Sequence, residues 1–260
     1  MGPDSANSAS PASWLVGHVG SRLRTELHGR LLVITMDHHP VNSLDAIAYQ
    51  ELFDVFTELA GETNLSAVLL RADNRCFSAG QDRRDAPNLA TEPDTYLTNA
   101  ANALVAATLC PVPLVVAVKN AAIGAGLILA ACADVLVLDA EATLMLPERK
   151  FGVIAGHAHI SQWIGLGAAL ATLTGEPIEP NTFTHGGAVV RSHTEVDPEA
   201  ERLARSIAES DPVLMRSTKF GWLDARRAIA RDYAAEMNRT ISLGLLDFSL
   251  PTSPEKQPDA

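Results

Sequence analysis

Two glycine-bearing turns could together bind an oxygen that carries negative charge. The first turn, CFSAGQD, spans residues 76–82 and places Ala79 and Gly80 after a predicted strand. The second, IGAGLIL, spans residues 123–129 and begins a predicted buried helix at Gly124 and Gly126. The first N–H groups of a helix have no intrahelical acceptor and lie at the positive end of the helix dipole. If the two turns converge, one N–H from each could bind a single carbonyl oxygen, which is the geometry of an oxyanion hole.

Each turn taken alone also has a purely structural interpretation. A short G-x-G run often marks close packing of a helix on a strand. The third glycine of the dinucleotide-binding fingerprint is absent, so that ligand is not indicated. The choice between a structural and a chemical role depends on whether the two turns meet.

The segment TLMLPERKFG, residues 143–152, supplies a candidate acid–base group. Glu148 follows Leu146 and Pro147 in a largely apolar stretch. A carboxylate beside apolar walls has a raised pKa and can transfer protons near neutral pH. The alternative is a solvated glutamate that pairs with Arg149 or Lys150.

The elements that would position these groups alternate between strands and helices. We expect a β-hairpin around His28 and Gly29, then strands at 66–72, 113–119 and 134–140, with helices at 42–61, 96–109 and 125–133. From Asp197 onward the pattern is mostly helical. Alternation of this kind predicts an α/β fold with right-handed βαβ crossovers and a parallel sheet. Residues 1–15 and 251–260 are rich in Pro, Ser and charge, and both are predicted to be disordered tails.

The composition excludes several classes of partner. The 260 residues carry a formal net charge of −11, whereas nucleic acids and anionic membranes bind basic surfaces. A local basic cluster could still bind a small polyanion. Cys76, Cys110 and Cys132 have neither metal-ligand spacing nor an even disulfide framework, which indicates buried thiols in a reducing cytosol. No apolar run has the length of a membrane span, and the N-terminus lacks the features of a signal peptide. A cytoplasmic protein with no metal site is therefore expected.

Six short motifs, taken in order, resemble those of one enzyme family. They are HPVNSL, FSAGQD, NAAIGAG, ACAD, LPERKFGV and LTGEPI. Their order and spacing over residues 20–250 are similar to those of the enoyl-CoA hydratase/isomerase family, also called the crotonase superfamily. The resemblance implies a crotonase-like (ClpP/crotonase) spiral of ββα units over residues 16–195 and a helical trimerisation region over 196–250. It also implies an acyl-CoA thioester as ligand, no cofactor apart from the coenzyme A of that substrate, and a homotrimer or a dimer of trimers.

The resemblance assigns roles to individual residues. It implies that the backbone N–H groups of Gln81 and Ala125 form the oxyanion hole and that Glu148 is the acid–base residue. It implies substrate contacts at Ala79, Gly80, Asp82, Gly124, Gly126, Ile128 and His157, and contacts with CoA phosphates at Arg83 and Arg84. Arg71 and Arg75 could add to that basic cluster, although a solvated loop is an equally good interpretation.

Two departures from the family pattern bear on the reaction. Hydratases of the family use two glutamates, and the first of these positions is Ile128 here. Because each general acid–base group contributes roughly 10²–10⁴-fold, hydration should be poor, and isomerisation of an enoyl-CoA with Glu148 alone is favoured. In addition, His157 and His159 stand where the family often has small residues, so either could be a second acid–base group or simply pack. His185 is expected to be structural. The alternatives are a non-catalytic acyl-CoA binding protein, or hydrolysis or decarboxylation that uses a histidine.

Overall fold

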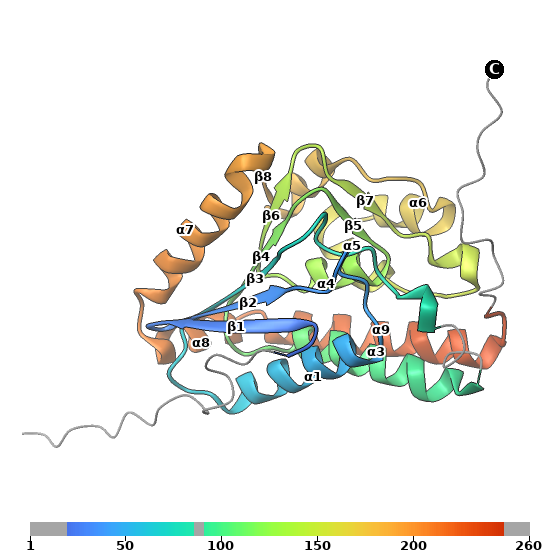
Figure 1. Ribbon diagram of the computed structural model, residues 1–260, viewed down its shortest axis with the longest axis horizontal. Helices are drawn as coiled ribbons and strands as arrows, with labels where there is room; N and C mark the ends of the chain where they lie inside the picture. The colour runs from blue at the N-terminus through green and yellow to red at the C-terminus, as the bar shows by residue number, and fades with distance from the viewer. Residues whose placement is uncertain (1–19, 86–90, 247–260) are drawn as a thin grey trace, which may run out of the picture.

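A mixed sheet forms the centre of the molecule. The computed structural model describes residues 20–85 and 91–246 (Figure 1). In these ranges the sheet has six strands in the order β1-β2-β3-β4-β6-β8. The strands are β1 (Leu23–His28), β2 (Leu31–Met36), β3 (Ala67–Ala72), β4 (Leu114–Val118), β6 (Val135–Asp139) and β8 (Val189–Arg191). Only the β1–β2 pair is antiparallel, so the predicted hairpin and the predicted parallel sheet are both confirmed. The tails predicted at 1–15 and 251–260 lie outside the described residues.

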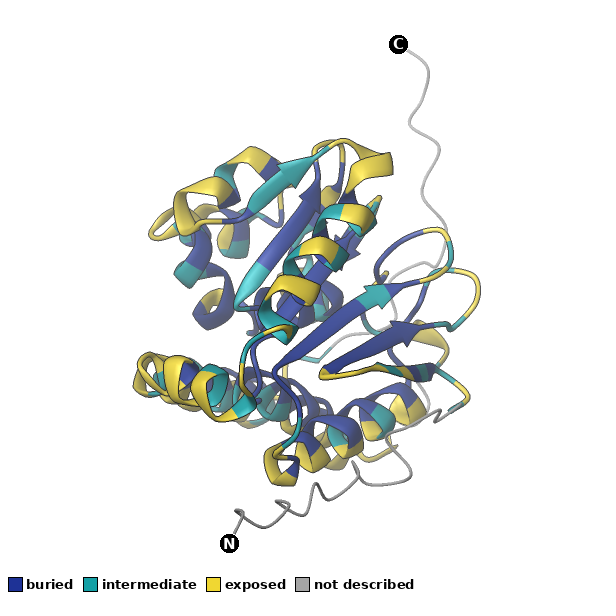
Figure 2. Cartoon of the chain, turned by 90° about the vertical axis from the view of Figure 1, so that its left-hand side faces the viewer, coloured by how far each residue is buried: buried dark blue, intermediate teal, exposed yellow. Residues whose placement is uncertain are grey.

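Helices cover both faces of this sheet. They are α1 (Ala46–Gly61), α3 (Pro93–Thr108), α4 (Ala125–Ala131), α5 (His157–Ile164), α6 (Gly167–Thr174), α7 (Val196–Ala208), α8 (Pro212–Phe220) and α9 (Leu223–Leu243). Four short 3₁₀ segments lie at Arg83–Asp85, Glu148–Phe151, Pro180–Gly186 and His193–Glu195. One face of the sheet is covered by α7, whose Val196, Ala200 and Ala204 follow helical spacing and pack on it. The larger core lies on the other face, where α1, α3 and α9 run side by side (Figure 1). The central strands are buried between these layers (Figure 2).

A second, two-stranded sheet brings the two chemical segments together. Strands β5 (Ala121–Ile123) and β7 (Thr143–Met145) pair in parallel, with Ile123 opposite Met145. Gly124 directly follows β5, and its N–H donates to the Met145 carbonyl at 2.8 Å. Because parallel strands end at the same edge, the pairing places Gly124 and the chain leading to Glu148 beside one another. Strands of three residues are too short for a pattern in the sequence to reveal them.

One buried carboxylate binds side chains from both C-terminal helices, α8 and α9, and from a residue between them. Asp134, at the end of the ACAD motif, accepts from Lys219 Nζ at 2.5 Å and from Arg226 Nη2 at 2.9 Å. The indole N–H of Trp222 also donates to Asp134, at 3.1 Å. The Leu114 N–H donates to it as well, at 2.8 Å, so each oxygen of this buried charge accepts two hydrogen bonds, as burial of a charge requires. Within residues 20–85 and 91–246, no helix is both long enough and apolar enough to cross a bilayer.

Candidate active site

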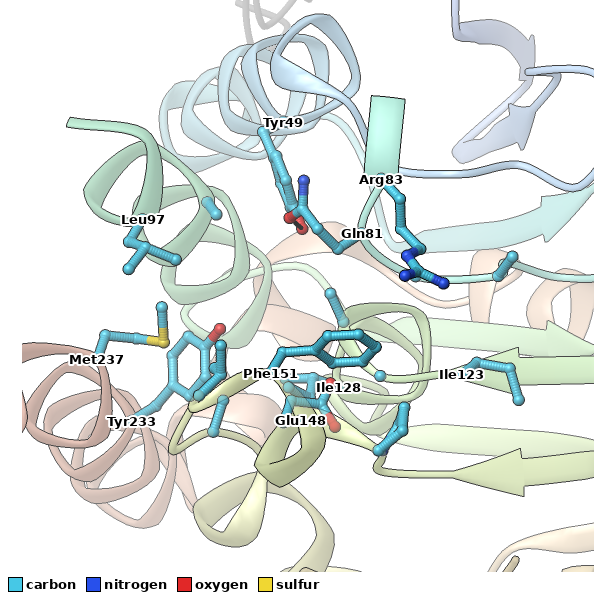
Figure 3. A pocket seen from close by; sticks show the side chains of 18 residues that line it. Tyr49, Gln81, Arg83, Leu97, Ile123, Ile128, Glu148, Phe151, Tyr233 and Met237 are labelled. Carbon is cyan, nitrogen blue, oxygen red and sulfur yellow. Dashed lines mark hydrogen bonds between the residues drawn. The ribbon is translucent and has the colours of Figure 1, made fainter. Parts of the chain in front are cut away.

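A cavity of about 230 Å³ lies where α1, α3, α4 and α9 meet the turn after β3 and the 3₁₀ segment after β7 (Figure 3). Of the residues singled out from the sequence, it is lined by Ala79, Gly80, Gln81, Arg83, Gly124, Ala125, Ile128 and Glu148. A cavity of roughly 150 Å³ is enough to bind benzene inside a protein. The space therefore suits a ring-sized acyl group or a short chain.

The two glycine turns meet at one wall of this cavity. Ser78 donates its N–H to the Ala121 carbonyl at 3.2 Å and accepts from the N–H of Ile123 at 3.0 Å. Gly80 has a φ of +79°, and a Cβ there would overlap the Ile123 carbonyl oxygen and lie 3.4 Å from the N of Ala125. The close approach of the two backbones therefore requires glycine at position 80.

The two N–H groups at this contact are available to a ligand. Helix α4 begins at Ala125, and its first intrahelical bond runs from Ile128 N–H to the Gly124 carbonyl at 3.0 Å. Within the described part of the chain, neither the N–H of Gln81 nor that of Ala125 has a protein acceptor. Since α4 has only seven residues, these donors act through local hydrogen bonds rather than through a long helix dipole.

Glu148 lies directly against the same wall. Gly124 has a φ of +54°, and a Cβ there would lie 2.5 Å from Glu148 Oε1. Glu148 Oε2 is buried and has no hydrogen-bond partner among the described residues. Burial raises the pKa of Glu148 to about 8. The neighbouring Arg149 and Lys150 side chains are exposed, and neither forms an ion pair with this carboxylate in the described structure. The solvated, ion-paired alternative is therefore wrong.

The rest of the cavity near Glu148 is apolar. Ile128 is 1% exposed and packs against Gly156, where a Cβ would lie 3.1 Å from Ile128 Cγ1. Glu148 supplies the only carboxylate among the described residues that line the cavity. This arrangement explains why desolvation is the largest cause of the raised Glu148 pKa.

A polar network that the sequence did not reveal forms the opposite wall. The Tyr49 hydroxyl donates to Gln81 Oε1 at 3.0 Å, and Gln81 Nε2 donates to the Tyr96 hydroxyl. Tyr96 in turn donates to Asp85 Oδ2 at 3.1 Å. Tyr49 and Tyr96 are buried on α1 and α3, and nothing in the sequence shows that their hydroxyls meet Gln81.

The basic residues near the cavity differ in their environment. The Arg83 guanidinium lies 5.4 Å from the centre of the Phe151 ring, at the cavity wall. Arg84 instead pairs with Asp82 at 2.5 Å and holds the pKa of that carboxyl well below its usual range. Neither Asp82 nor Arg84 lines the cavity, which departs from the expectation of direct substrate contact.

Three further candidates also lie outside the cavity lining. Gly126 packs against Ser78, where a Cβ would lie 2.7 Å from the serine Cβ. Arg71 Nε donates to Thr35 Oγ1 at 3.3 Å. The Arg75 carbonyl accepts from Asn120 at 2.8 Å. Gly126 and Arg71 therefore contact a turn and the sheet, and the backbone of Arg75 contacts Asn120.

His157 and His159, which stand where the family often has small residues, do not line the cavity either. His157 is the exposed first residue of α5 and lies outside the lining, so the expected substrate contact is not found. His159 is fully buried, with Nε2 at 2.8 Å from Thr108 Oγ1, and burial lowers its pKa to about 3. The helical phase of α5 therefore turns one histidine to the surface and the other into the core. His185 is exposed and contacts the Thr182 carbonyl at 3.0 Å.

One cluster has the residue types of a metal site. Ligand atoms of His38, Asp45 and Asp82 lie within 4.8 Å of one another. Asp45 pairs with Arg22 at 2.6 Å, and Asp82 pairs with Arg84. Because an arginine neutralises each carboxylate, a cation would have to displace two ion pairs to bind here.

Comparison with known proteins points to one group of enzymes. A family model described as enoyl-CoA hydratase/isomerase matches residues 26–237. A Mycobacterium tuberculosis protein named (7aS)-7a-methyl-1,5-dioxo-2,3,5,6,7,7a-hexahydro-1H-indene-carboxyl-CoA hydrolase is 31% identical over 224 residues, which cover 83% of this chain and 90% of that protein. A probable enoyl-CoA hydratase of Bacillus subtilis is 27% identical and covers 71% of this chain and 75% of its own. The crystal structure of an enoyl-CoA hydratase/isomerase from Mycobacterium paratuberculosis has a TM-score of 0.79 at 22% identity, covering 89% of this chain and 96% of that one.

Proposed function

Because the chain belongs to the enoyl-CoA hydratase/isomerase family and has the crotonase fold, we propose that its cavity binds an enoyl-CoA thioester and that Glu148 shifts the double bond. The supporting observation is a single carboxylate, whose Oε2 has no partner among the described residues, beside two N–H groups that have no protein acceptor there. The finer assignment, isomerisation rather than another reaction of the family, follows from the absence of a second acid at Ile128.

The thioester carbonyl would bind at the contact of the two turns. The N–H groups of Gln81 and Ala125 would donate to its oxygen, and these bonds strengthen as negative charge develops there. The backbone positions of these donors are set by the packing of Gly80 on Ile123, so no reorganisation is needed during the reaction. Removal of one such donor typically costs roughly 10²–10³-fold in rate.

Glu148 would move one proton in two steps. The ionised carboxylate first removes a proton from C2 of a 3-enoyl-CoA, and the electron pair of that C–H bond forms an enolate on the thioester oxygen. The protonated Glu148 then gives the proton to C4 as the double bond forms between C2 and C3. Atoms and electrons balance within the substrate. A pKa of about 8 suits this exchange, because neither protonation state is strongly favoured near neutral pH.

Hydration is the less favoured reaction for a structural reason. It needs a second group to position and deprotonate a water molecule, and Ile128 occupies the cavity wall where the family's hydratases carry an acid. The change Ile128→Glu tests this explanation. We expect the variant to gain addition of water by at least roughly 10-fold while the double-bond shift falls. A variant that folds but adds no water would contradict the explanation.

Hydrolysis is a second candidate, because the M. tuberculosis relative is named a CoA hydrolase. A histidine-dependent version has little support, since His157 is exposed outside the lining and His159 is buried behind it. A version that uses Glu148 to activate water stays open. Mass spectrometry of the products separates the candidates: isomerisation leaves the mass of the thioester unchanged, hydration adds one water to the intact thioester, and hydrolysis of the thioester bond gives the free acid and coenzyme A.

Arg83 is the proposed contact for the phosphates of coenzyme A. It lines the cavity, whereas Arg84 lies outside the lining and pairs with Asp82. We also expect a homotrimer or a dimer of trimers. The support is the exposed apolar surface of α6, where Leu166 is 91% exposed and Leu170 and Leu173 are also exposed. Light scattering of the wild type and of a Leu170→Asp variant tests the assembly.

The decisive experiment uses 3-hexenoyl-CoA. The wild type should form the conjugated 2-enoyl thioester, followed by ultraviolet absorbance, and Glu148→Gln should lower the rate by roughly 10²–10⁴-fold. Glu141→Gln is the matched control, because Glu141 is an exposed glutamate outside the cavity. Tight binding of the thioester without turnover of any substrate would instead favour the non-catalytic binding protein.

A further inference from the structure

Tyr233 places an unused hydroxyl in the acyl cavity. It lies on α9, is 2% exposed and lines the cavity. Its hydroxyl has no hydrogen-bond partner among the residues that the structure describes. Figure 3 shows this hydroxyl pointing into the space between Leu97 and Phe151, and Glu148 lies across the same cavity. Because this hydroxyl faces the cavity, a ligand that fills the cavity without offering it an acceptor would bury it unpaired, which is costly.

The position of Tyr233 is fixed by the helix that carries it. One turn further along α9, Glu236 accepts from the N–H groups of Gly156 and Ala158 at 2.8 and 3.0 Å. Another turn on, Thr240 accepts from the Ile154 N–H at 2.8 Å. These bonds lock the face of α9 that includes Tyr233 onto the chain that follows Glu148.

The Tyr233 ring is held from behind as well. The buried His159 ring contacts it edge to face, with centroids 4.8 Å apart. The lowered pKa of His159 keeps that ring neutral, so it packs without bringing a charge toward the cavity. Tyr233 is therefore a rigid donor, not a side chain that happens to be rotated inward.

The Tyr49 hydroxyl, on the opposite wall of the cavity, cannot donate a hydrogen bond to a ligand. Asp85 accepts the Tyr96 hydroxyl, so the Tyr96 oxygen accepts from Gln81 Nε2 and leaves Gln81 Oε1 to accept from Tyr49. The proton of Tyr49 is thereby committed within the protein. Tyr49 can offer a ligand only its oxygen lone pair, whereas Tyr233 can donate a proton.

We propose that the Tyr233 hydroxyl donates to a carbonyl oxygen on the acyl group, so that the site prefers an acyl-CoA that carries an oxo group over a plain hydrocarbon thioester. The proposal rests on the proposed function only in taking the cavity as the acyl site. A hydrocarbon chain would leave the Tyr233 proton buried and unpaired, whereas an oxo group would accept it. The apolar residues around the cavity would then pack on the rest of the acyl group.

The test compares matched ligands by calorimetry. Hexanoyl-CoA is titrated into the protein beside its 3-oxo, 4-oxo and 5-oxo counterparts, because the structure does not dictate which carbon carries the oxygen. The wild type should bind at least one oxo thioester roughly 10-fold more tightly than hexanoyl-CoA. Tyr233→Phe should abolish that preference and leave hexanoyl-CoA binding nearly unchanged.

Two controls make the result decisive. Tyr233→Phe removes an oxygen with no partner in the described protein, so its thermal unfolding should match that of the wild type. Met237→Leu changes an apolar residue of the same cavity and helix, and it should alter the affinities for both ligands by the same factor. Equal binding of all four ligands by the wild type, or an equal loss for both ligand types in Tyr233→Phe, would overturn this inference alone. Failure of every thioester to bind would overturn the proposed function with it.

Discussion

The protonation state of Glu148 should control the pH dependence of catalysis. Burial raises the pKa of this carboxyl to about 8, and the described structure places no cation against it. With that pKa, the ionised fraction is about 1% at pH 6, about 10% at pH 7 and about half at pH 8. If the carboxylate is the base that removes the C2 proton, kcat/KM should rise with this fraction. The expected increase from pH 6 to pH 9 is therefore about 90-fold.

The assay measures initial rates of double-bond shift at a 3-hexenoyl-CoA concentration far below KM. Under that condition the rate reports kcat/KM, whose pH dependence reflects groups of the free enzyme. Ionic strength is kept constant across the series, because the proposed contacts between Arg83 and the CoA phosphates would weaken with salt. Glu148→Gln is measured in parallel and should be slower by roughly 10²–10⁴-fold, with no rise over this range.

Three results would refute the reasoning. A midpoint near 4.5, the ordinary value for glutamate, would mean that the carboxyl is solvated in the working enzyme. A flat profile would mean that a step without proton transfer limits kcat/KM. If Glu148→Gln kept the rise between pH 6 and pH 9, another group would be the base.

Three further predictions follow from single contacts. The folded-state pKa of Glu148 exceeds the unfolded value of 4.5, so the native state holds an extra proton between about pH 4.5 and 8. The free energy of unfolding should therefore fall as the pH rises across that window, by up to about 5 kcal/mol. Urea titrations should show this loss in the wild type but not in Glu148→Gln. Gly80→Ala should lower kcat/KM by at least roughly 100-fold, because the added Cβ would overlap the Ile123 carbonyl. The control Gly187→Ala should keep near-normal activity, since Gly187 has a φ of +89° but open space around it. Equal losses in the two variants would contradict the role of the backbone contact. Asp134→Asn should cost about 3–5 kcal/mol in urea unfolding, because it leaves two buried cations without their partner, and the exposed Asp224→Asn should cost little.

The frame of the fold could be predicted from local patterns, and the small second sheet could not. The β1–β2 hairpin, helix α1 and strands β3, β4 and β6 all lie where apolar periodicity placed them. Strands β5, β7 and β8 have three residues each, which is too short for periodicity to be visible. They form because distant segments pair, and the pairing of β5 with β7 is what brings Gly124 and Glu148 into one wall.

The site shows the same division between local and distant determinants. The turns around Gly80 and Gly124 carry their own signal, since a close backbone contact restricts the residue type. The sequence does not mark Tyr49 and Tyr233 in this way, because a tyrosine at a buried helical position is equally typical of the hydrophobic core. The two tyrosines also lie on helices that are nearly 200 residues apart in the chain. His157 lies outside the cavity lining because the helix that starts at that residue sets which way its side chain faces, and the sequence alone does not determine that phase.

Ile128 affects Glu148 in two ways that act in the same direction. By replacing an acid, it removes the group that would hold and deprotonate a water molecule. By lining the cavity with hydrocarbon, it also contributes to the desolvation that raises the Glu148 pKa. A second carboxylate would share a proton with Glu148, and the two would titrate as a coupled pair with separate roles as acid and base. An isolated carboxyl with a pKa near 8 can instead take a proton from one carbon and return it to another at little cost in either direction. Under the proposed function, the same isoleucine would therefore weaken hydration and also adjust Glu148 to a reaction in which one group must serve as base and then as acid.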